Sequence, residues 1–186
     1  VFLMLTTIGV LFYLNTISTK EAYENQKHSQ EVVGLVDQTV GHALEIQSAF
    51  STFMLVSNNT YLDPVERART RIRQNLDRLR VITANSPDRL DEVNRIDQTL
   101  KEYVSEVTRK TDLRKMEGPA VVDTQLPWGD GKTMLDQVRV SGERIKGLTL
   151  AELQRRERSG DLRFTVTVWV LIVSSLAGIL SLGVAN

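Results

Sequence analysis

The fold is decided by the stretch KTMLDQVRVSGERIKGLTLAELQRRERSGDLRFTVTVWVLIVSSLAGILSLGV, residues 132–184. Its second part, residues 164–184, contains 21 residues and no charge, and at about 1.5 Å per residue such a helix crosses a hydrocarbon layer of about 30 Å. Its first part is amphipathic, with apolar residues at helical spacing among charged ones: Leu135, Val138, Ile145, Leu148 and Leu153. The stretch predicts one helix that begins in a water-exposed core and ends in a bilayer.

The other end of the chain carries a matching apolar segment. Residues 1–14 are uncharged, and the apolar character fades over residues 15–18. Such a segment reaches about 21–27 Å as a helix, and it starts without a methionine or a charged flank. We therefore predict a first transmembrane helix over residues 1–18, truncated at its start, and a second over residues 164–184. The alternative is a signal peptide, but no basic segment precedes this one and no small-residue cleavage site follows it.

Composition limits the function of the segment between the spans, residues 19–163. The segment is long enough for one domain with its own core. The 23 basic residues balance the 23 acidic ones, so no overall charge recruits nucleic acid, and we expect no nucleic-acid partner. The chain has no cysteine, which excludes disulfides and thiolate catalysis. Only four prolines and 11 glycines occur, which favours a mostly helical domain.

Apolar periodicity predicts four helices in this domain. The first continues from the first span to residue 56 and ends at the turn formers of residues 57–60. Its expected buried positions are Val33, Val36, Val40, Leu44, Gln47, Phe50 and Met54. The second begins at Asp63-Pro64, where we expect Asp63 to cap the helix and to form a capping box with Glu66. Its buried positions are expected to be Val65, Ala68, Ile72, Leu76, Leu79 and Ile82.

The third helix begins at Pro87, with Ser86 as its cap, and the fourth begins after Gly131. The apolar residues of the third are Leu90, Val93, Ile96, Leu100, Tyr103, Val104 and Val107. The tight connection between the second and third helices makes them antiparallel neighbours. We predict an all-α fold, an elongated antiparallel four-helix bundle flanked by two transmembrane helices, both of which leave the bundle at the same end.

Catalytic chemistry is scarce in this sequence. The two histidines are 14 residues apart, and His42 with Glu45 forms only a His-x-x-Glu pattern, which is more often a solvated pair than a metal site. No phosphate loop, nucleophile elbow, kinase signature or dinucleotide-binding signature occurs. We expect no catalytic residue, no cofactor and no metal.

The second helix is rich in arginine, at positions Arg67, Arg69, Arg71, Arg73, Arg78 and Arg80. In one interpretation Arg67, Arg71 and Arg78 contact an anionic ligand or partner. In the other, which the acidic third helix favours, these side chains form a solvated face that pairs with opposite charges across the hairpin. Trp128, in the loop before the fourth helix, has a similar pair of interpretations: contact with a small molecule, or a plug over the end of the bundle.

The second span contains small residues four apart: Ser174 with Gly178, and Ala177 with Ser181. Such spacing lets another helix approach closely. We predict a contact either with the first span or with a second copy of the chain, and we predict that the protein is a homodimer.

Three short motifs resemble the type-three CHASE domain. They are Phe53-Met54-Leu55 followed by Tyr61-Leu62, then Leu76-Asp77-Arg78-Leu79-Arg80, and Gly131-Lys132 with Leu135-Asp136-Gln137-Val138-Arg139. The resemblance covers about residues 20–158 and includes the order of a span, four helices and a second span. It implies an extracytoplasmic sensory module of a bacterial inner-membrane receptor. The output of such a receptor is a histidine kinase of a two-component system, a diguanylate cyclase or a chemotaxis-type coil, and the family supplies no catalytic residues.

We therefore predict a homodimeric sensor whose first and fourth helices relay an external cue, a small molecule or a protein, to a cytoplasmic output domain. The alternative is a membrane-anchored helical scaffold that binds a partner protein and has no signalling output. A carboxylate metal enzyme is a weaker alternative, since Glu-x-x-His motifs are missing. The external, periplasmic placement rests on the resemblance, because four arginines at positions 155–163 favour the opposite orientation by the positive-inside tendency.

Overall fold

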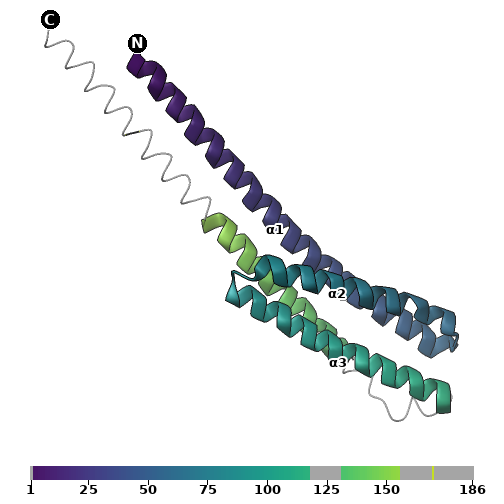
Figure 1. Ribbon diagram of the computed structural model, residues 1–186. Helices are drawn as coiled ribbons and strands as arrows, with labels where there is room; N and C mark the ends of the chain where they lie inside the picture. Colours follow the sequence, from purple (N-terminus) through teal and green to yellow (C-terminus); the bar gives the residue numbers. More distant parts are fainter. Residues whose placement is uncertain (1, 118–130, 156–168, 170–186) are drawn as a thin grey trace, which may run out of the picture. The chain divides into compact units, whose positions relative to one another are not determined.

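The computed structural model describes the backbone of residues 2–117, 131–155 and 169, and within these ranges the side chains of residue 20 and of residues 23 onward. The described residues are helical, with α1 at Phe2–Val56, the 3-10 helix η1 at Asn59–Leu62, α2 at Asp63–Thr83 and α3 at Pro87–Glu117 (Figure 1). A fourth α-helix spans residues 131–155. The prediction of an all-helical chain with four helices is confirmed.

The chain divides into two compact units, Gln30–Thr149 and the remainder. The first is the helical bundle. The second includes the N-terminal half of α1 and the last residues of the fourth helix. Among the residues that the structure describes, no helix is both long and apolar enough to cross a membrane. The predicted second span lies outside the described residues except for Trp169.

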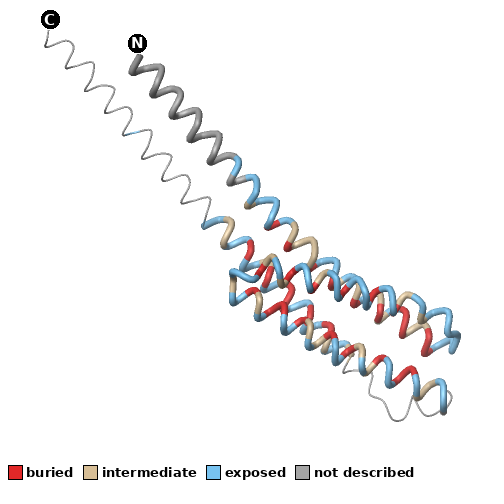
Figure 2. Tube along the Cα trace, viewed as in Figure 1, coloured by how far each residue is buried: buried red, intermediate tan, exposed pale blue. Residues whose placement is uncertain are grey.

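In the bundle, consecutive helices run antiparallel and turn one apolar side inward, as the buried positions in Figure 2 show. Each helix contributes a stripe of residues spaced three or four apart, which is the spacing that keeps side chains on one helical face. The most deeply buried large side chains are Val32, Val36, Ile46, Phe53, Leu76, Leu79, Val93, Ile96, Val138 and Ile145. They form one continuous core.

The end of α1 is closed by local chemistry. Ser57 takes the left-handed conformation, with φ of 57°, and its N–H donates to the Phe53 carbonyl oxygen at 2.7 Å. This bond pairs one of the carbonyl groups that every helix leaves free at its C-terminus. The expectation that α1 ends at the polar cluster after Val56 is confirmed.

The predicted cap at Asp63 is wrong. The residue before α2 is Leu62, which makes no side-chain capping bond, and Asp63 is the first residue of the helix. The reason is that η1 runs directly into α2, so Asp63 already has helical angles, φ −56° and ψ −37°, and its N–H donates to the Thr60 carbonyl. A capping residue instead needs an extended backbone. Asn58 has that backbone, and its side chain caps η1 by accepting from the Thr60 N–H at 3.0 Å.

Two glycines of the fourth helix allow close packing. A Cβ atom at Gly142 would lie 3.0 Å from Cγ1 of Val36, so α1 packs directly on the backbone of the fourth helix at this point. A Cβ at Gly131 would lie 3.3 Å from the ring of Tyr103 on α3. Small residues at these positions therefore set how closely the fourth helix approaches its neighbours.

Candidate functional site

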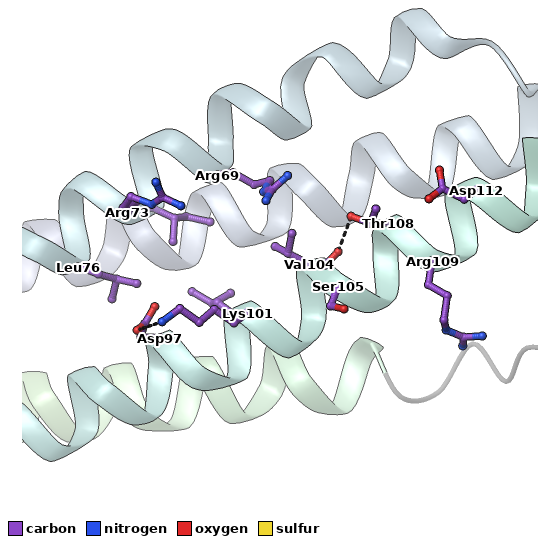
Figure 3. Close-up of a pocket in the computed structure, with 12 residues that line it drawn as sticks. Arg69, Arg73, Leu76, Asp97, Lys101, Val104, Ser105, Thr108, Arg109 and Asp112 are labelled. Atoms are coloured by element: carbon purple, nitrogen blue, oxygen red, sulfur yellow. Dashed lines mark hydrogen bonds and ion pairs between the residues drawn. The ribbon is translucent and has the colours of Figure 1, made fainter.

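A groove of about 700 Å³ lies between α2 and α3 (Figure 3). Four apolar side chains line it, Ile72 and Leu76 from α2 and Leu100 and Val104 from α3. We call this apolar set the groove floor. Along α2, the groove extends from Leu76 in the direction away from the α2–α3 turn. Its volume lies within the range of about 300–1,000 Å³ that small-molecule sites occupy.

Charged and hydroxyl side chains line the rest of this groove. Arg69 and Arg73 come from α2, and α3 contributes six more: Asp97, Lys101, Ser105, Thr108, Arg109 and Asp112. Three of the four cations have acidic partners on their own helix. Arg69 pairs with Glu66 at 2.8 Å, Lys101 with Asp97 at 2.7 Å, and Arg109 with Glu106 at 2.7 Å.

Arg73 is the exception among the groove cations. It is exposed, and among the described residues it forms no hydrogen bond or ion pair. Its guanidinium therefore keeps its donors available on the groove side of α2, as Figure 3 shows.

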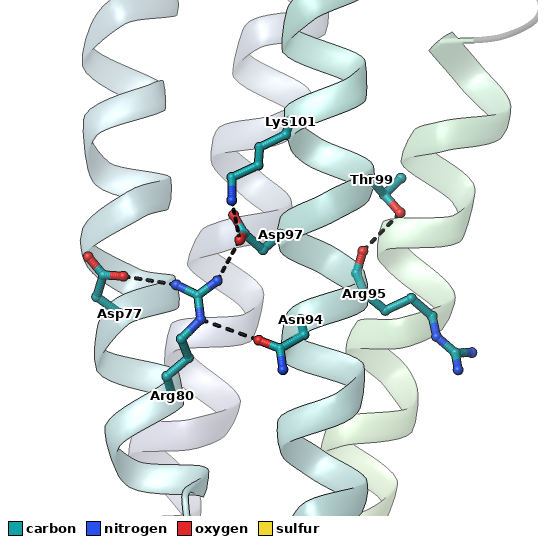
Figure 4. Close-up of polar contacts among 7 residues, drawn as sticks. All are labelled: Asp77, Arg80, Asn94, Arg95, Asp97, Thr99 and Lys101. Atoms are coloured by element: carbon teal, nitrogen blue, oxygen red, sulfur yellow. Dashed lines mark hydrogen bonds and ion pairs between the residues drawn. The ribbon is translucent and has the colours of Figure 1, made fainter.

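On the side of the groove nearer the α2–α3 turn, Arg80 joins the two helices (Figure 4). Its guanidinium donates to Asp97 of α3 at 2.5 Å and to Asp77 of α2 at 2.9 Å. It also donates to Asn94 at 3.4 Å. This cross-helix pairing fixes which turn of α2 faces which turn of α3.

Similar ion pairs join the other neighbouring helices at the same end of the bundle. Arg78 of α2 pairs with Glu31 of α1 at 2.7 Å, and Arg144 of the fourth helix pairs with Glu92 of α3 at 3.3 Å. Lys146 of the fourth helix pairs with Asp37 of α1 at 3.0 Å. Together with Arg80–Asp97, these pairs form what we call the ion-pair belt. Exposed pairs contribute only about 0–1 kcal/mol each, so the belt fixes register more than it adds stability.

The belt affects the pKa of two of its cations. Hydrogen bonding and charge attraction from Glu31 raise the pKa of Arg78. Hydrogen bonds to Glu143 and then to Asp37 raise the pKa of Lys146. Both groups remain cationic throughout the physiological range, so the belt stays paired there.

At the opposite end of the bundle, α3 is hydrogen-bonded to the C-terminal end of α1. Arg114 donates to the Met54 carbonyl at 2.8 Å and to the Ser57 hydroxyl at 3.1 Å. A cation at a helix C-terminus pairs a free carbonyl and interacts favourably with the helix dipole. The ammonium of Lys115 lies 5.9 Å from the centre of the Phe53 ring, within cation–π range.

Tyr103 of α3 is almost fully buried beside Gly131. Burial disfavours the phenolate and raises the pKa of Tyr103 to about 12. At Tyr103, the side of α3 that faces the fourth helix is therefore shielded from water, while another side of α3 lines the open groove.

The structure places the predicted contact residues as follows. Arg67 and Arg71 are exposed and do not line the groove, and Arg78 is held by Glu31. Trp128, Ser174, Ala177, Gly178 and Ser181 lie outside the described residues. Their contacts stay predictions.

Two arginines that line the groove, Arg69 and Arg73, were in the arginine set but were not selected as contact residues. Arg69, Arg73, Leu76 and Arg80 follow one another at intervals of four, three and four, which is one face of a helix. That spacing was the signal in the sequence that these side chains share one face of α2. It identifies groove-lining residues only once the structure shows that this face is turned toward α3.

The pairing of opposite charges across the hairpin is found at Arg80 and Asp97. His42 and Glu45 also contact each other, with Nδ1 of the histidine 3.2 Å from a carboxylate oxygen. Within residues 2–117 and 131–155, no group of three or more acidic or histidine side chains is placed to hold a metal ion.

These features define the class of the protein: a helical bundle with a lined groove and ion-paired helices. The chain belongs to the CHASE3 family, whose domain model matches residues 22–159. CHASE3 domains are extracytoplasmic sensory domains of membrane receptors and are not catalytic. The chain is therefore a sensory input module, and the predicted resemblance is confirmed.

Two individual proteins are also similar to this chain. The chaperone protein ClpB of Bacteroides thetaiotaomicron is 26% identical over 166 residues, which cover 84% of this chain and 17% of the chaperone. The chain thus spans about a sixth of that curated relative. The crystal structure of the sensor domain of the Rhodopseudomonas palustris histidine kinase HK9 is 23% identical, with a TM-score of 0.45, and the match covers 72% of this chain and 98% of that one.

Proposed function

We propose that this chain is the input module of a homodimeric transmembrane receptor in the bacterial inner membrane, with residues 1–18 and 164–184 as its membrane spans. The bundle lies outside the cytoplasm. A cue that binds the bundle changes the relative position of α1 and the fourth helix. The change passes to a cytoplasmic output domain, which is a histidine kinase, a diguanylate cyclase or a chemotaxis-type coil.

The observation that carries this proposal is the continuity of α1. This helix has no break from Phe2 to Val56, and its 55 residues correspond to about 80 Å of helix. Its first residues are the apolar segment of the sequence, and residues from Val32 to Met54 belong to the bundle core. A continuous helix passes a shift of one or two ångströms, or a small rotation, from one end to the other.

The homodimer is supported by the second apolar segment. Its small residues at spacing four, Ser174 with Gly178 and Ala177 with Ser181, allow two helices to approach closely. A pair of such segments at the centre of a dimer gives each fourth helix a counterpart against which to move.

The test is to change the phase of the fourth helix. Residues 1–186 are fused to the cytoplasmic part of a two-component histidine kinase, and one to four alanines are inserted after Arg155. Each alanine turns the following segment by about 100° relative to the bundle. Autophosphorylation in membrane vesicles should vary with the insertion and return toward the starting level at four residues, because four residues make about one full turn.

The control is the same set of insertions directly after Glu117, outside the relay helices, which should leave autophosphorylation unchanged. Kinase activity that is the same for all insertions after Arg155 would contradict the relay. It would favour the alternative, a membrane-anchored helical scaffold that binds a partner protein and has no signalling output.

A further inference from the structure

We infer that the groove between α2 and α3 binds a small organic acid, with its carboxylate at Arg73 and its apolar part on the groove floor (Figure 3). The inference rests on the proposed sensory function and names the chemical class of the cue. Three observations carry it: the size and lining of the groove, the register of charges along it, and the lack of any partner for Arg73 within the described residues.

The lining of the groove fits an amphipathic molecule. The groove floor consists of Ile72, Leu76, Leu100 and Val104, and the total volume is about 700 Å³. Small-molecule sites are mostly apolar and use a few placed polar groups to fix orientation. Removing an apolar ring or short chain from water onto this floor supplies the driving force for binding.

The register of charges leaves the groove with an unmatched cation. The Arg80–Asp97 pair aligns the two antiparallel helices, so Arg73 and Arg69 face the part of α3 that follows Asp97. The groove-lining positions there are Lys101, Val104, Ser105 and Thr108, none of which is acidic. Glu106 lies nearby on α3, but it pairs with Arg109 and Lys110. An anion from outside the chain therefore fits where α3 offers no carboxylate.

Arg73 is the group that would hold this anion. Arg69, Lys101 and Arg109 already pair with acidic residues of their own helices. Arg73 forms no hydrogen bond or ion pair with the part of the chain that the structure describes. A guanidinium binds a carboxylate through two parallel N–H donors, which is stronger and more directional than contact with an uncharged oxygen.

The far end of the groove favours one carboxylate over two. Asp112 lines that end and lies 11 residues beyond Lys101, about 16 Å along α3. Its negative charge repels a second acidic group placed there. The ligand therefore carries its charge at the Arg73 end and extends its apolar part toward Asp112.

The test is a titration of the whole chain, residues 1–186, in lipid nanodiscs with methyl-labelled isoleucine and leucine. The probe is 3-phenylpropionate, and its uncharged match is 3-phenyl-1-propanol. We expect saturable shifts of the methyl signals of Ile72, Leu76 and Leu100 with 3-phenylpropionate, and binding about tenfold weaker with the alcohol, since the charge-assisted bond is lost. Inorganic phosphate should neither shift these signals nor compete.

Two arginine variants localise the carboxylate. Arg73→Gln should weaken binding of 3-phenylpropionate about tenfold. Arg67→Gln is the matched control, because Arg67 is an exposed arginine of the same helix that does not line the groove, and it should bind as the parent does. Circular dichroism melting confirms that both variants remain folded.

Several outcomes would overturn the inference. They are equal binding of acid and alcohol, equal loss in the two arginine variants, competition by phosphate alone, and absence of saturable shifts. Concentration-dependent shifts of the same methyl groups without a probe would mean that a second copy of the chain fills the groove, which also overturns it. If binding fails while alanine insertions still change kinase output, the inference falls and the proposed function stands. If the probe binds but the alanine insertions do not change kinase output, the groove binds an organic acid and the proposed relay function is wrong.

Discussion

The two ends of the bundle are built differently. At the turn end, where α2 meets α3, the ion-pair belt joins every pair of neighbouring helices, and Val32, Leu79, Val93 and Ile145 beside it are completely buried. At the groove end, the α2 side chains that line the groove form no ion pair with α3 in the described part of the chain. Charge pairing therefore holds the bundle in register at one end, whereas at the other end a groove separates the charged side chains of α2 from those of α3.

The largest expected difference between the two ends is in the cost of removing a leucine. Leu79→Ala at the turn end should lower the free energy of unfolding by about 4 kcal/mol, because Leu79 is surrounded by core on all sides and leaves a cavity. Leu100→Ala in the groove floor should cost about 2 kcal/mol, because Leu100 is buried but borders the groove, so that neighbouring side chains and water can fill part of the space that the truncation leaves. Urea unfolding of the two variants measures both values. Equal costs would mean that the groove end is packed as tightly as the turn end.

A smaller effect sharpens the description of the groove end, and it depends on pH. The pKa of Tyr103 is raised to about 12 in the folded chain, whereas an unfolded tyrosine ionises near 10. Between these values the unfolded state loses a proton and the folded state keeps it, so stability falls as pH rises from about 10 through 12. The loss attributable to Tyr103 at pH 12 should be on the order of 2 kcal/mol.

The control for this prediction is Tyr103→Phe, measured by urea unfolding at several pH values from 8 to 12. The variant should show a flatter decline with pH than the parent. Identical declines would mean that water reaches the phenol and that the side of α3 facing the fourth helix is as open as the groove.

The smallest effect concerns the packing of α1 on the fourth helix. Gly142→Ala should destabilise the bundle by about 1 kcal/mol, because its Cβ would lie 3.0 Å from the buried Val36, and the strain exceeds the gain in helix propensity. Gly147→Ala is the matched control on the same helix. Nothing lies within 4 Å of its added Cβ, so it should stabilise by about 0.5–1 kcal/mol. If the melting temperatures of both variants shift in the same direction, α1 does not pack closely on the fourth helix at Gly142.

Helix ends could be predicted well from the sequence because they depend on local chemistry. The polar cluster after Val56 and the proline at Pro87 end or begin helices for reasons that lie within a few residues. The prediction that Asp63 caps α2 failed for an equally local reason, because the 3-10 helix η1 ends directly before Asp63 and gives this residue helical backbone angles. Local signals conflict there, and the sequence does not say which one prevails.

The buried faces were predicted less well. Leu44 was expected in the core but is 39% exposed, while Ala43 is buried. In the fourth helix, Ser141 and Thr149 are buried although neither is apolar. Helices that pack closely use small side chains at their contacts, and such residues carry little hydrophobic signal. Choosing between adjacent positions requires the partner helix.

The roles of the arginines near the groove could not be predicted from the sequence for the same reason. Six arginines on α2 are equivalent in the sequence, and their roles separate only when the helix is rotated into place. Arg80 then meets Asp97, Arg78 meets Glu31 and Arg73 is left at the groove. Composition therefore singled out α2 as the arginine-rich helix, and the phase of that helix relative to α1 and α3 determined which arginine meets which partner.

The bond from Arg114 to the Met54 carbonyl has a mechanical consequence. Arg114 lies two residues beyond Asp112, so the helix that forms one wall of the groove also holds the last turn of α1. A displacement of this part of α3 would therefore act on the C-terminal end of α1 through the hydrogen bonds of Arg114. One side chain thus links the wall of the groove to the C-terminal turn of α1.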